Sequence, residues 1–195
     1  LSLVTLSLGC GSSVEREDTR PADERNMEPD QLDETYFVTA DELQSLADDG
    51  AIIVDSRKPE LYEQGHFPGA VNVHGGKPWK DDNGFLLSDV VESQEIARSY
   101  GLTRSKDIVI YTDARSKRAS RLALTLEYFG HGKVSIYVPG YENLKSELGF
   151  EAQTEAPDIS EGDFVVSYRG DIIATDEEVK AAVEGDKNAV LIDTR

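Results

Sequence analysis

"AIIVDSR", residues 51–57, is the stretch that decides the fold. Its uninterrupted apolar run ends in an acidic residue, a pattern typical of a strand that is covered on both faces. Similar runs recur as "DIVIYT" at 107–112 and "KVSIYV" at 133–138. Helical patterns separate these runs. Strands that alternate with helices predict an α/β domain with a mostly parallel central sheet flanked by helices.

The helical patterns have recognisable ends and faces. Thr39 followed by Glu42 forms a capping pattern at the start of the first helix, and Gly50 marks its end. Another helical pattern covers residues 120–130. In it we expect four residues to face mainly inward: Leu122, Leu124, Leu126 and Phe129.

The composition limits the class of protein. A length of 195 residues suffices for one full domain and part of another. The net charge of −18 argues against a nucleic-acid partner, because no basic face is large enough to neutralise many phosphates. No apolar run of about 18 residues occurs, so no transmembrane helix is expected. One cysteine cannot form a disulfide within the chain, and we expect no metal site and no cofactor.

The first ten residues, "LSLVTLSLGC", are largely apolar and end in Gly-Cys. They are typical of the end of a truncated lipoprotein signal (1–10) with Cys10 as the lipid-attachment residue, although such signals prefer leucine where Ser7 stands. This hypothesis places the protein in a bacterial cell envelope, periplasmic or on the outer surface, with the lipid anchor as its only membrane contact. The alternative is an ordinary apolar N-terminus with a chance cysteine.

Residues 11–35 hold nine acidic residues, three arginines, two prolines and almost no apolar residues. Such a segment cannot bury enough apolar surface to offset the entropy of ordering. We therefore expect a disordered acidic tether that joins the anchor to the domain.

A helix–strand unit occurs twice. The pattern of residues 39–57 returns at 174–195, and both units end in Asp-(Ser/Thr)-Arg. The two aspartates, Asp55 and Asp193, are 138 residues apart, a period that indicates a domain duplication rather than a solenoid. The expected organisation is a first domain, an acidic linker and the truncated start of a second domain, at 36–150, 151–163 and 164–195.

A basic loop follows the second of the buried strands, in "IVIYTDARSKRASR" at 108–121. Ligands of parallel sheets bind at the carboxyl ends of strands, where the next helix also aims its first amides. Arg115, Lys117 and Arg118 are therefore candidates for binding an anion or for pairing with another domain. The alternative is a solvated basic loop at the start of a helix.

Two longer stretches carry a family resemblance. "IIVDSRKPELYEQGHFPGAVNV" at 52–73 resembles the rhodanese signature, and "DIVIYTDARSKRASRLALTLEYFGHGKVSIYVPGYENL" at 107–144 resembles the second half of a rhodanese domain. The match spans about residues 36–150, and 164–195 resemble the start of a second copy. The chain departs from the family at Leu144, which stands where a tryptophan is usual.

The resemblance implies a sulfurtransferase. Rhodaneses move a sulfane sulfur from thiosulfate, or a related donor, to a thiophilic acceptor such as cyanide or a thiol. A cysteine at the start of the loop becomes a persulfide, which requires a thiolate. Here Thr112 occupies the position of that nucleophile, so the first domain is expected to be non-catalytic, and no catalytic residue is expected in this chain.

The resemblance to tandem rhodaneses implies a second domain that carries the cysteine. Thr112 follows Asp55 by 57 residues, so the equivalent loop should begin near position ~250. The family places the aspartate matched by Asp193 beside the catalytic pocket of the second domain. It also makes Asp55 and Arg57 a structural pair.

Three functions remain open. The first is a thiosulfate sulfurtransferase in which this chain is the inactive half. The second is a rhodanese-like module without catalysis, which binds an anion or a partner. The third is sulfur transfer to a thiol of a partner protein. A cysteine in the second loop would separate the first function from the second.

Overall fold

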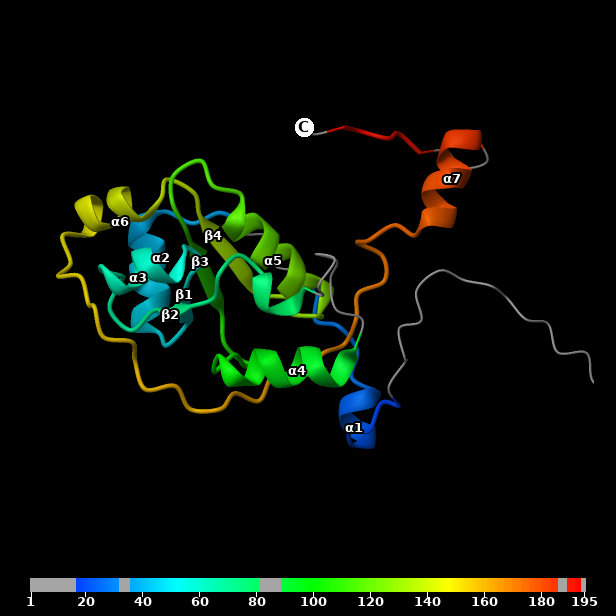
Figure 1. Ribbon diagram of the computed structural model, residues 1–195, viewed down its shortest axis with the longest axis horizontal. Helices are drawn as coiled ribbons and strands as arrows, with labels where there is room; N and C mark the ends of the chain where they lie inside the picture. The colour runs from blue at the N-terminus through cyan, green and yellow to red at the C-terminus, as the bar shows by residue number, and fades with distance from the viewer. Residues whose placement is uncertain (1–16, 32–35, 81–88, 186–188, 194–195) are drawn as a thin grey trace, which may run out of the picture.

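The computed structural model describes residues 17–31, 36–80, 89–185 and 189–193. Four parallel strands form one sheet in the order β2-β1-β3-β4. Helices cover both sides of the sheet, which confirms the predicted α/β class (Figure 1). The strand bounds are Ile52–Asp55 for β1, Val71–Asn72 for β2, Ile108–Tyr111 for β3 and Val134–Tyr137 for β4.

Seven α-helices and one 3₁₀ helix are found in the described ranges. Their bounds are Ala22–Arg25 (α1), Ala40–Asp48 (α2), Pro59–Glu63 (α3), Lys77–Trp79 (η1, the 3₁₀ helix), Val90–Ser99 (α4), Arg118–Tyr128 (α5), Tyr141–Leu148 (α6) and Asp176–Glu184 (α7). In these ranges no helix combines the length and the apolar character needed to cross a bilayer.

The alternation of side chains along the strands builds two cores. Ile53, Val109 and Tyr111 face the layer that contains α2 and α6. Val54 and Ile110 face the layer that contains α4, α5 and η1. Because both faces of β1 and β3 are covered, nearly every residue of these strands is apolar, which is the pattern from which they were predicted.

The predicted start of the first helix is confirmed. Thr39 Oγ1 accepts a hydrogen bond from the Glu42 amide at 3.3 Å, and a Glu42 carboxylate oxygen accepts one from the Thr39 amide at 2.7 Å. This reciprocal capping box satisfies two amides that the helix itself leaves unpaired. Gly50 follows the helix with a φ of 92°, a backbone conformation that favours glycine.

The prediction for Leu124 was wrong. Leu122, Leu126 and Phe129 are fully buried, but Leu124 is 45% exposed. Residues two positions apart on a helix point in nearly opposite directions, so Leu124 cannot share the inward face with Leu122 and Leu126.

The described part of the N-terminal segment, 17–31, lies against the domain instead of forming the solvated tether that its composition predicts. Glu24 accepts hydrogen bonds from Arg98 at 2.9 Å and from Gln94 at 2.6 Å, which places α1 beside α4 (Figure 1). Asp30 pairs with Arg104 at 2.8 Å. Polar bonds to fixed partners thus order a segment that lacks an apolar face. Composition alone does not reveal such partners.

The boundary expected at residue 164 also differs from the structure. Phe164 and Val166 are fully buried in the core that contains α4 and α5. The Phe164 amide donates to the Leu102 carbonyl at 3.2 Å, and the Ser167 amide donates to the Phe129 carbonyl at 2.9 Å. Residues 164–169 therefore complete the packing of the first domain rather than open a second one.

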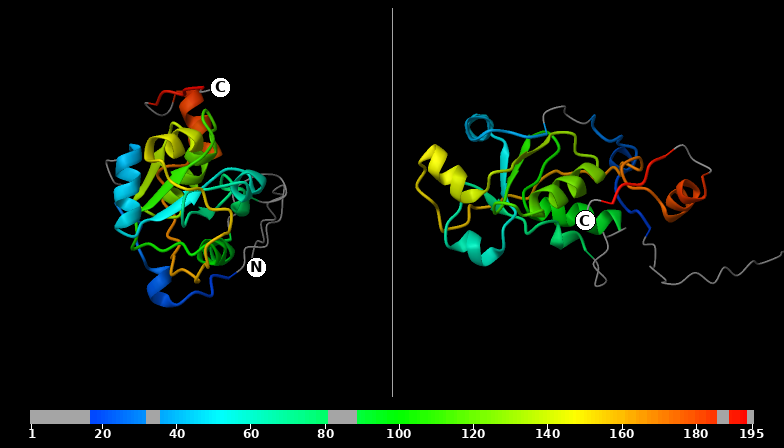
Figure 2. Two further views of the ribbon diagram at one scale, coloured as in Figure 1. Left: turned by 90° about the vertical axis from the view of Figure 1, so that its left-hand side faces the viewer. Right: turned by 90° about the horizontal axis from the view of Figure 1, so that it is seen from above.

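Helix α7 lies outside the sheet and buries none of its residues (Figures 1 and 2). Its start nevertheless repeats that of α2, since Thr175 and Glu178 form a second capping box. The strand expected before Asp193 does not form, and residues 189–193 are exposed without regular structure. A strand forms by pairing with another strand, and the described sheet consists of β1 to β4 alone.

Candidate functional site at the carboxyl edge of the sheet

The carboxyl ends of β1 and β3 meet at one edge of the sheet. Asp55 is paired in register with Tyr111, and the Ser56 amide donates to the Tyr111 carbonyl at 2.9 Å. The loop that begins at Thr112 therefore starts beside the Asp-Ser-Arg end of β1. This is the edge where parallel sheets bind their ligands.

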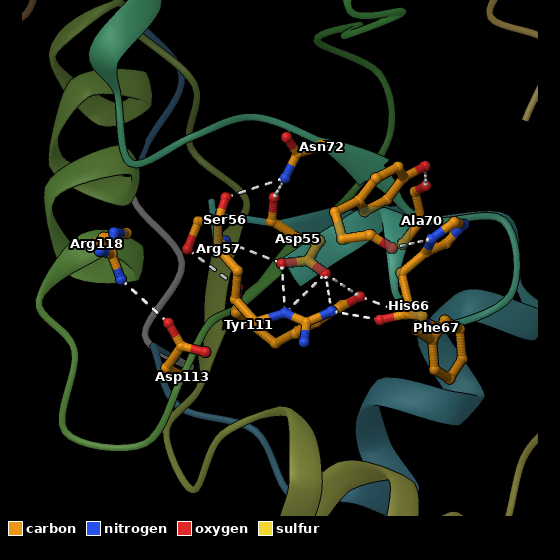
Figure 3. Close-up of polar contacts among 12 residues, drawn as sticks. Asp55, Ser56, Arg57, His66, Phe67, Ala70, Asn72, Tyr111, Asp113 and Arg118 are labelled. Carbon is orange, nitrogen blue, oxygen red and sulfur yellow. Dashed lines mark hydrogen bonds and ion pairs between the residues drawn. The ribbon is translucent and has the colours of Figure 1, made fainter. Parts of the chain in front are cut away.

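Asp55 and Arg57 are in direct contact at this edge (Figure 3). Arg57 Nη2 lies 2.7 Å from Asp55 Oδ2, and Arg57 Nε donates to both carboxylate oxygens. The Asp55 side chain is fully buried, and Arg57 is 4% exposed. Burial alone would lower the pKa of the Arg57 guanidinium, but the hydrogen bonds and the charge of Asp55 raise it. Both charges are therefore buried and paired with each other, which agrees with the predicted structural pair without testing its role.

Aromatic residues enclose the pair. The guanidinium of Arg57 lies 3.7 Å from the ring centre of Tyr141, and the Tyr111 hydroxyl donates to Asp55 at 2.8 Å. Burial and then the charge of Asp55 raise the pKa of Tyr111 well above its usual range. Tyr111 therefore stays protonated and holds the carboxylate rather than serving as a base.

His66 belongs to the same packed region. Its ring stacks on Tyr62 at 3.7 Å between ring centres, and its Nδ1 lies 2.9 Å from the Tyr62 carbonyl. The His66 amide also donates to the Gln153 carbonyl at 2.8 Å. The side chain is fully buried, its Nε2 has no hydrogen-bond partner among the described residues, and the backbone bond ties the turn at His66 to the segment after α6.

Thr112 lies at the base of the loop and does not reach its surface. The residue is 3% exposed, and its Oγ1 has no hydrogen-bond partner among the described residues. The Thr112 carbonyl accepts from the Tyr141 amide at 2.9 Å, which fixes the backbone against α6. No base contacts this hydroxyl in the described structure, so the geometry does not activate it as a nucleophile.

The rest of the loop surrounds an open depression of about 520 Å³. Arg115, Lys117 and Arg118, the three predicted cations, all line it. Arg118 pairs with Asp113 at 3.1 Å, and both side chains are about one-third exposed. Arg115 takes a φ of 60°, which a residue with a side chain rarely adopts.

A larger cleft of about 880 Å³ opens beside this loop and was not foreseen from the sequence. Lys117 and Arg118 line it, whereas Arg115 does not. The other basic residues of its wall come from η1, the turn after it and α5: Lys77, Lys80 and Arg121. The stretch "GGKPWK" at 75–80, with two lysines after a Gly-Gly pair, is the sequence feature that could have suggested a second basic surface. Nothing in this stretch indicates that it lies against α5.

The other predicted site residues lie elsewhere. Asp193 is exposed in the segment 189–193, and Cys10 lies outside the described residues. In the described ranges, no group of three or more His, Cys, Asp or Glu side chains is placed to hold a metal ion.

The chain matches a family model. The model of the Rhodanese-like domain matches residues 39–147, which include β1, the basic loop and α6 up to Glu147. The match starts at the Thr39 cap and covers the Asp55–Arg57 pair and Thr112.

Known proteins resemble the chain along most of this domain. The thiosulfate sulfurtransferase of Corynebacterium glutamicum is 28% identical over 134 residues, which are 67% of this chain and 42% of that protein. The 3-mercaptopyruvate sulfotransferase SseA of Escherichia coli is 25% identical with a TM-score of 0.69, over 78% of this chain and 63% of SseA. An anaerobic ergothioneine biosynthesis enzyme of Chlorobium limicola shares the fold, with a TM-score of 0.61 at 19% identity over 76% of this chain and 41% of the enzyme. The chain spans less than half the length of the curated relatives it matches.

Proposed function

This chain belongs to the rhodanese-like domain family, and from that premise we propose that it is the non-catalytic first domain of a tandem thiosulfate sulfurtransferase. The similarity to a thiosulfate sulfurtransferase and to a mercaptopyruvate sulfotransferase supports the reaction class. The catalytic cysteine would lie in a second domain, to which the repeated helix start at Thr175 belongs.

The proposal rests on one observation, namely that a threonine, Thr112, follows β3 at the start of the loop where the family reaction needs a cysteine. The family reaction needs a cysteine thiolate to attack the outer sulfur of thiosulfate, so that a sulfur–sulfur bond forms and sulfite leaves with the electron pair. A nucleophile of the acceptor, such as cyanide, then takes the sulfur and restores the thiolate. A threonine hydroxyl cannot form a persulfide, and that of Thr112 is also buried. The described domain therefore contributes structure and binding rather than the nucleophile.

Mass spectrometry of the full-length protein after incubation with thiosulfate tests this proposal. We expect one added sulfur atom on a cysteine beyond Arg195, which cyanide removes as thiocyanate. The matched control is the chain 1–195 with Cys10→Ser, which removes its one cysteine and should gain no sulfur. Sulfur bound within residues 36–150 would show that the interpretation of Thr112 is wrong.

A full-length protein that gains no sulfur at all would favour the second candidate function, a rhodanese-like module that binds an anion or a partner. The specific observation behind this candidate is the basic cleft next to the loop. A protein that releases its sulfur to a partner's thiol but not to cyanide would instead have the partner as its acceptor.

We also propose that Cys10 carries the lipid anchor and that the protein resides in a bacterial cell envelope. Expression of the chain with its native leader in a bacterial host should give a membrane-bound form whose Cys10 carries acyl groups. Cys10→Ser should release that form from the membrane. If Cys10→Ser leaves the fractionation unchanged, the anchor proposal fails.

A further inference from the structure

The cleft beside α5 gathers basic side chains in a chain whose acidic residues outnumber its basic ones. Five basic side chains line its volume of about 880 Å³, and none of the lining residues that the structure describes is acidic. The whole chain has a net charge of −18. Four of the five form no ion pair with another described residue: Lys77, Lys80, Lys117 and Arg121.

Two glycines bring these charges together. Gly75 and Gly76 have φ values of 52° and 73°, and they lie directly against α5. A Cβ on Gly75 would come within 3.1 Å of the Arg118 side chain, and one on Gly76 within 3.2 Å of Thr125 Oγ1. This close approach sets the two lysines of residues 77–80 beside the basic start of α5. Basic side chains that line one cleft repel one another, and a bound anion would relieve that repulsion.

The surroundings of the cleft agree with a positive local field. Burial, followed by the charges of Arg118 and Lys77, lowers the pKa of the His74 imidazole at its rim. The first turn of α5 contains no acidic residue that would balance the positive end of the helix dipole.

The size and the walls of the cleft restrict the ligand. Its volume lies within the range of about 300–1,000 Å³ that is typical of small-molecule sites and exceeds what one tetrahedral anion fills. Two exposed apolar side chains, Leu124 and Ile173, form another part of the wall. The cleft thus offers several cations for phosphate-type groups and an apolar surface for an organic part.

We propose that the cleft lined by Lys77, Lys80 and Arg121 binds an organic anion with two or more phosphate groups. The cleft adjoins the depression of the loop 112–118 and shares Lys117 and Arg118 with it, whereas Arg115 lines only the depression and Lys77, Lys80 and Arg121 line only the cleft. The proposal goes beyond the sulfurtransferase proposal and does not depend on it, since no sulfur transfer is involved.

Isothermal titration calorimetry of the chain 1–195 with ADP, inorganic pyrophosphate and adenosine tests the site. At about 50 mM salt we expect ADP to bind more tightly than pyrophosphate, adenosine not to bind, and higher salt to weaken both anions. Lys77→Gln and Arg121→Gln should each weaken binding about fivefold or more, because each removes a charge-assisted hydrogen bond at a partly exposed site. Lys106→Gln, an exposed lysine outside the cleft, is the matched control and should leave the affinity unchanged.

Three results would overturn the proposal. One is the absence of binding for both ADP and pyrophosphate. Another is an equal loss of affinity in the Lys106→Gln control, which would indicate non-specific attraction, or a loss of affinity confined to Arg115→Gln, which would assign the binding to the loop depression. The third is binding to phosphatidylglycerol vesicles without binding of either soluble anion, which would assign the surface to a membrane.

Discussion

At the scale of single residues, the carboxyl edge of the sheet is held by a buried charge pair whose hydrogen bonds are all made within the protein. Asp55 accepts from the Arg57 side chain, the Arg57 amide and the Tyr111 hydroxyl. Arg57 also donates to the Gly65 carbonyl at 2.6 Å. The pair thus fixes the turn after β1, the turn at residue 65 and the end of β3. Its members depend on one another, because burial leaves each charge without water.

Removing one partner should therefore be costly. Arg57→Ala is expected to lower the free energy of unfolding by about 3–5 kcal/mol, since it leaves the Asp55 carboxylate buried without its counter-charge. Urea denaturation measures the change. Lys58→Ala, at the exposed neighbouring position, should change stability by less than about 0.5 kcal/mol. Equal effects of the two substitutions would show that the pair does not hold this edge.

The buried hydroxyl of Thr112 leads to the opposite expectation. Thr112→Val keeps the shape of the side chain and removes an oxygen that has no partner in the described structure, so stability should stay the same or rise by up to about 1 kcal/mol. Ser56→Ala is the comparison, because Ser56 Oγ donates to the Tyr111 carbonyl at 3.0 Å, and its loss should cost about 1 kcal/mol. If Thr112→Val destabilises more than Ser56→Ala in urea denaturation, the hydroxyl has a partner that this structure does not describe.

At the scale of elements, the same local signal appears in two different settings. Helices α2 and α7 both begin with a Thr…Glu capping box, but α2 buries Ala40 and Leu43 in the core, whereas α7 buries no residue. A cap determines where a helix begins. The packing of its apolar face determines how much that helix matters for the stability of the domain.

Substitution of the two caps should separate these effects. Thr39→Ala is expected to lower the global free energy of unfolding by about 1 kcal/mol, since α2 unfolds with the core. Thr175→Ala should leave the global transition of the chain unchanged and speed amide exchange within residues 176–184. Denaturation combined with hydrogen exchange measures both. A global loss from Thr175→Ala would mean that α7 is part of the cooperative unit.

The turn between α5 and β4 contains a histidine that should make stability depend on pH. His131 is fully buried, its Nδ1 accepts from the Lys133 amide at 3.1 Å, and its Nε2 faces the Thr103 carbonyl at 3.2 Å. Both bonds fit the neutral ring with a proton on Nε2. Burial lowers the pKa of His131 below its usual 6.5, because the charged form is poorly solvated there.

The sign of the effect follows from proton binding. Below pH 6.5 the unfolded chain binds a proton at this histidine, whereas the folded chain does not until its lower pKa is reached. The stabilising contribution of the neutral His131 is therefore fully present above pH 6.5 and is lost as the pH falls toward the lowered folded pKa. His131→Gln should be less stable at neutral pH but should lose less stability between pH 7 and pH 5. Thermal denaturation of both proteins across this range is the measurement. Parallel pH profiles would rule out His131 as the source.

At the scale of the whole molecule, segments from both sides of the family match close the domain. Residues 17–31 lie against α4 and the turn after α5, and residues 164–169 complete the core beside α4 and α5. Arg20 joins the two segments, since its guanidinium donates to the Gln94 side chain at 3.0 Å and to the Val166 carbonyl. The folding unit is therefore longer than the matched residues 39–147.

A fragment of residues 36–150 should thus be less stable than one of residues 17–169. Removal of Phe164 and Val166 exposes the apolar side of α4 and α5, and Phe164→Ala alone should cost about 3–5 kcal/mol. Urea denaturation of the two fragments and of Phe164→Ala measures these differences. Val179→Ala, on the exposed face of α7, is the control and should have little effect. Equal stability of the two fragments would show that the first domain ends at residue 150, as the sequence predicts.

The sequence by itself determined β1, β3 and β4, the capped start of α2 and the family, because these depend on local periodicity, on short-range hydrogen bonds and on motifs such as the Asp-Ser-Arg of residues 55–57. The resemblance also predicts that Thr112 stands at the position of the nucleophile, and this stays a prediction. Only the tertiary structure decided which distant segments meet. It placed Lys77 and Arg121 on the walls of one cleft, brought Glu24 to Arg98 and buried Phe164 in the first domain. Such contacts depend on how the sheet and its helices pack in space, and no local sequence pattern predicts contacts between residues that are far apart in the chain.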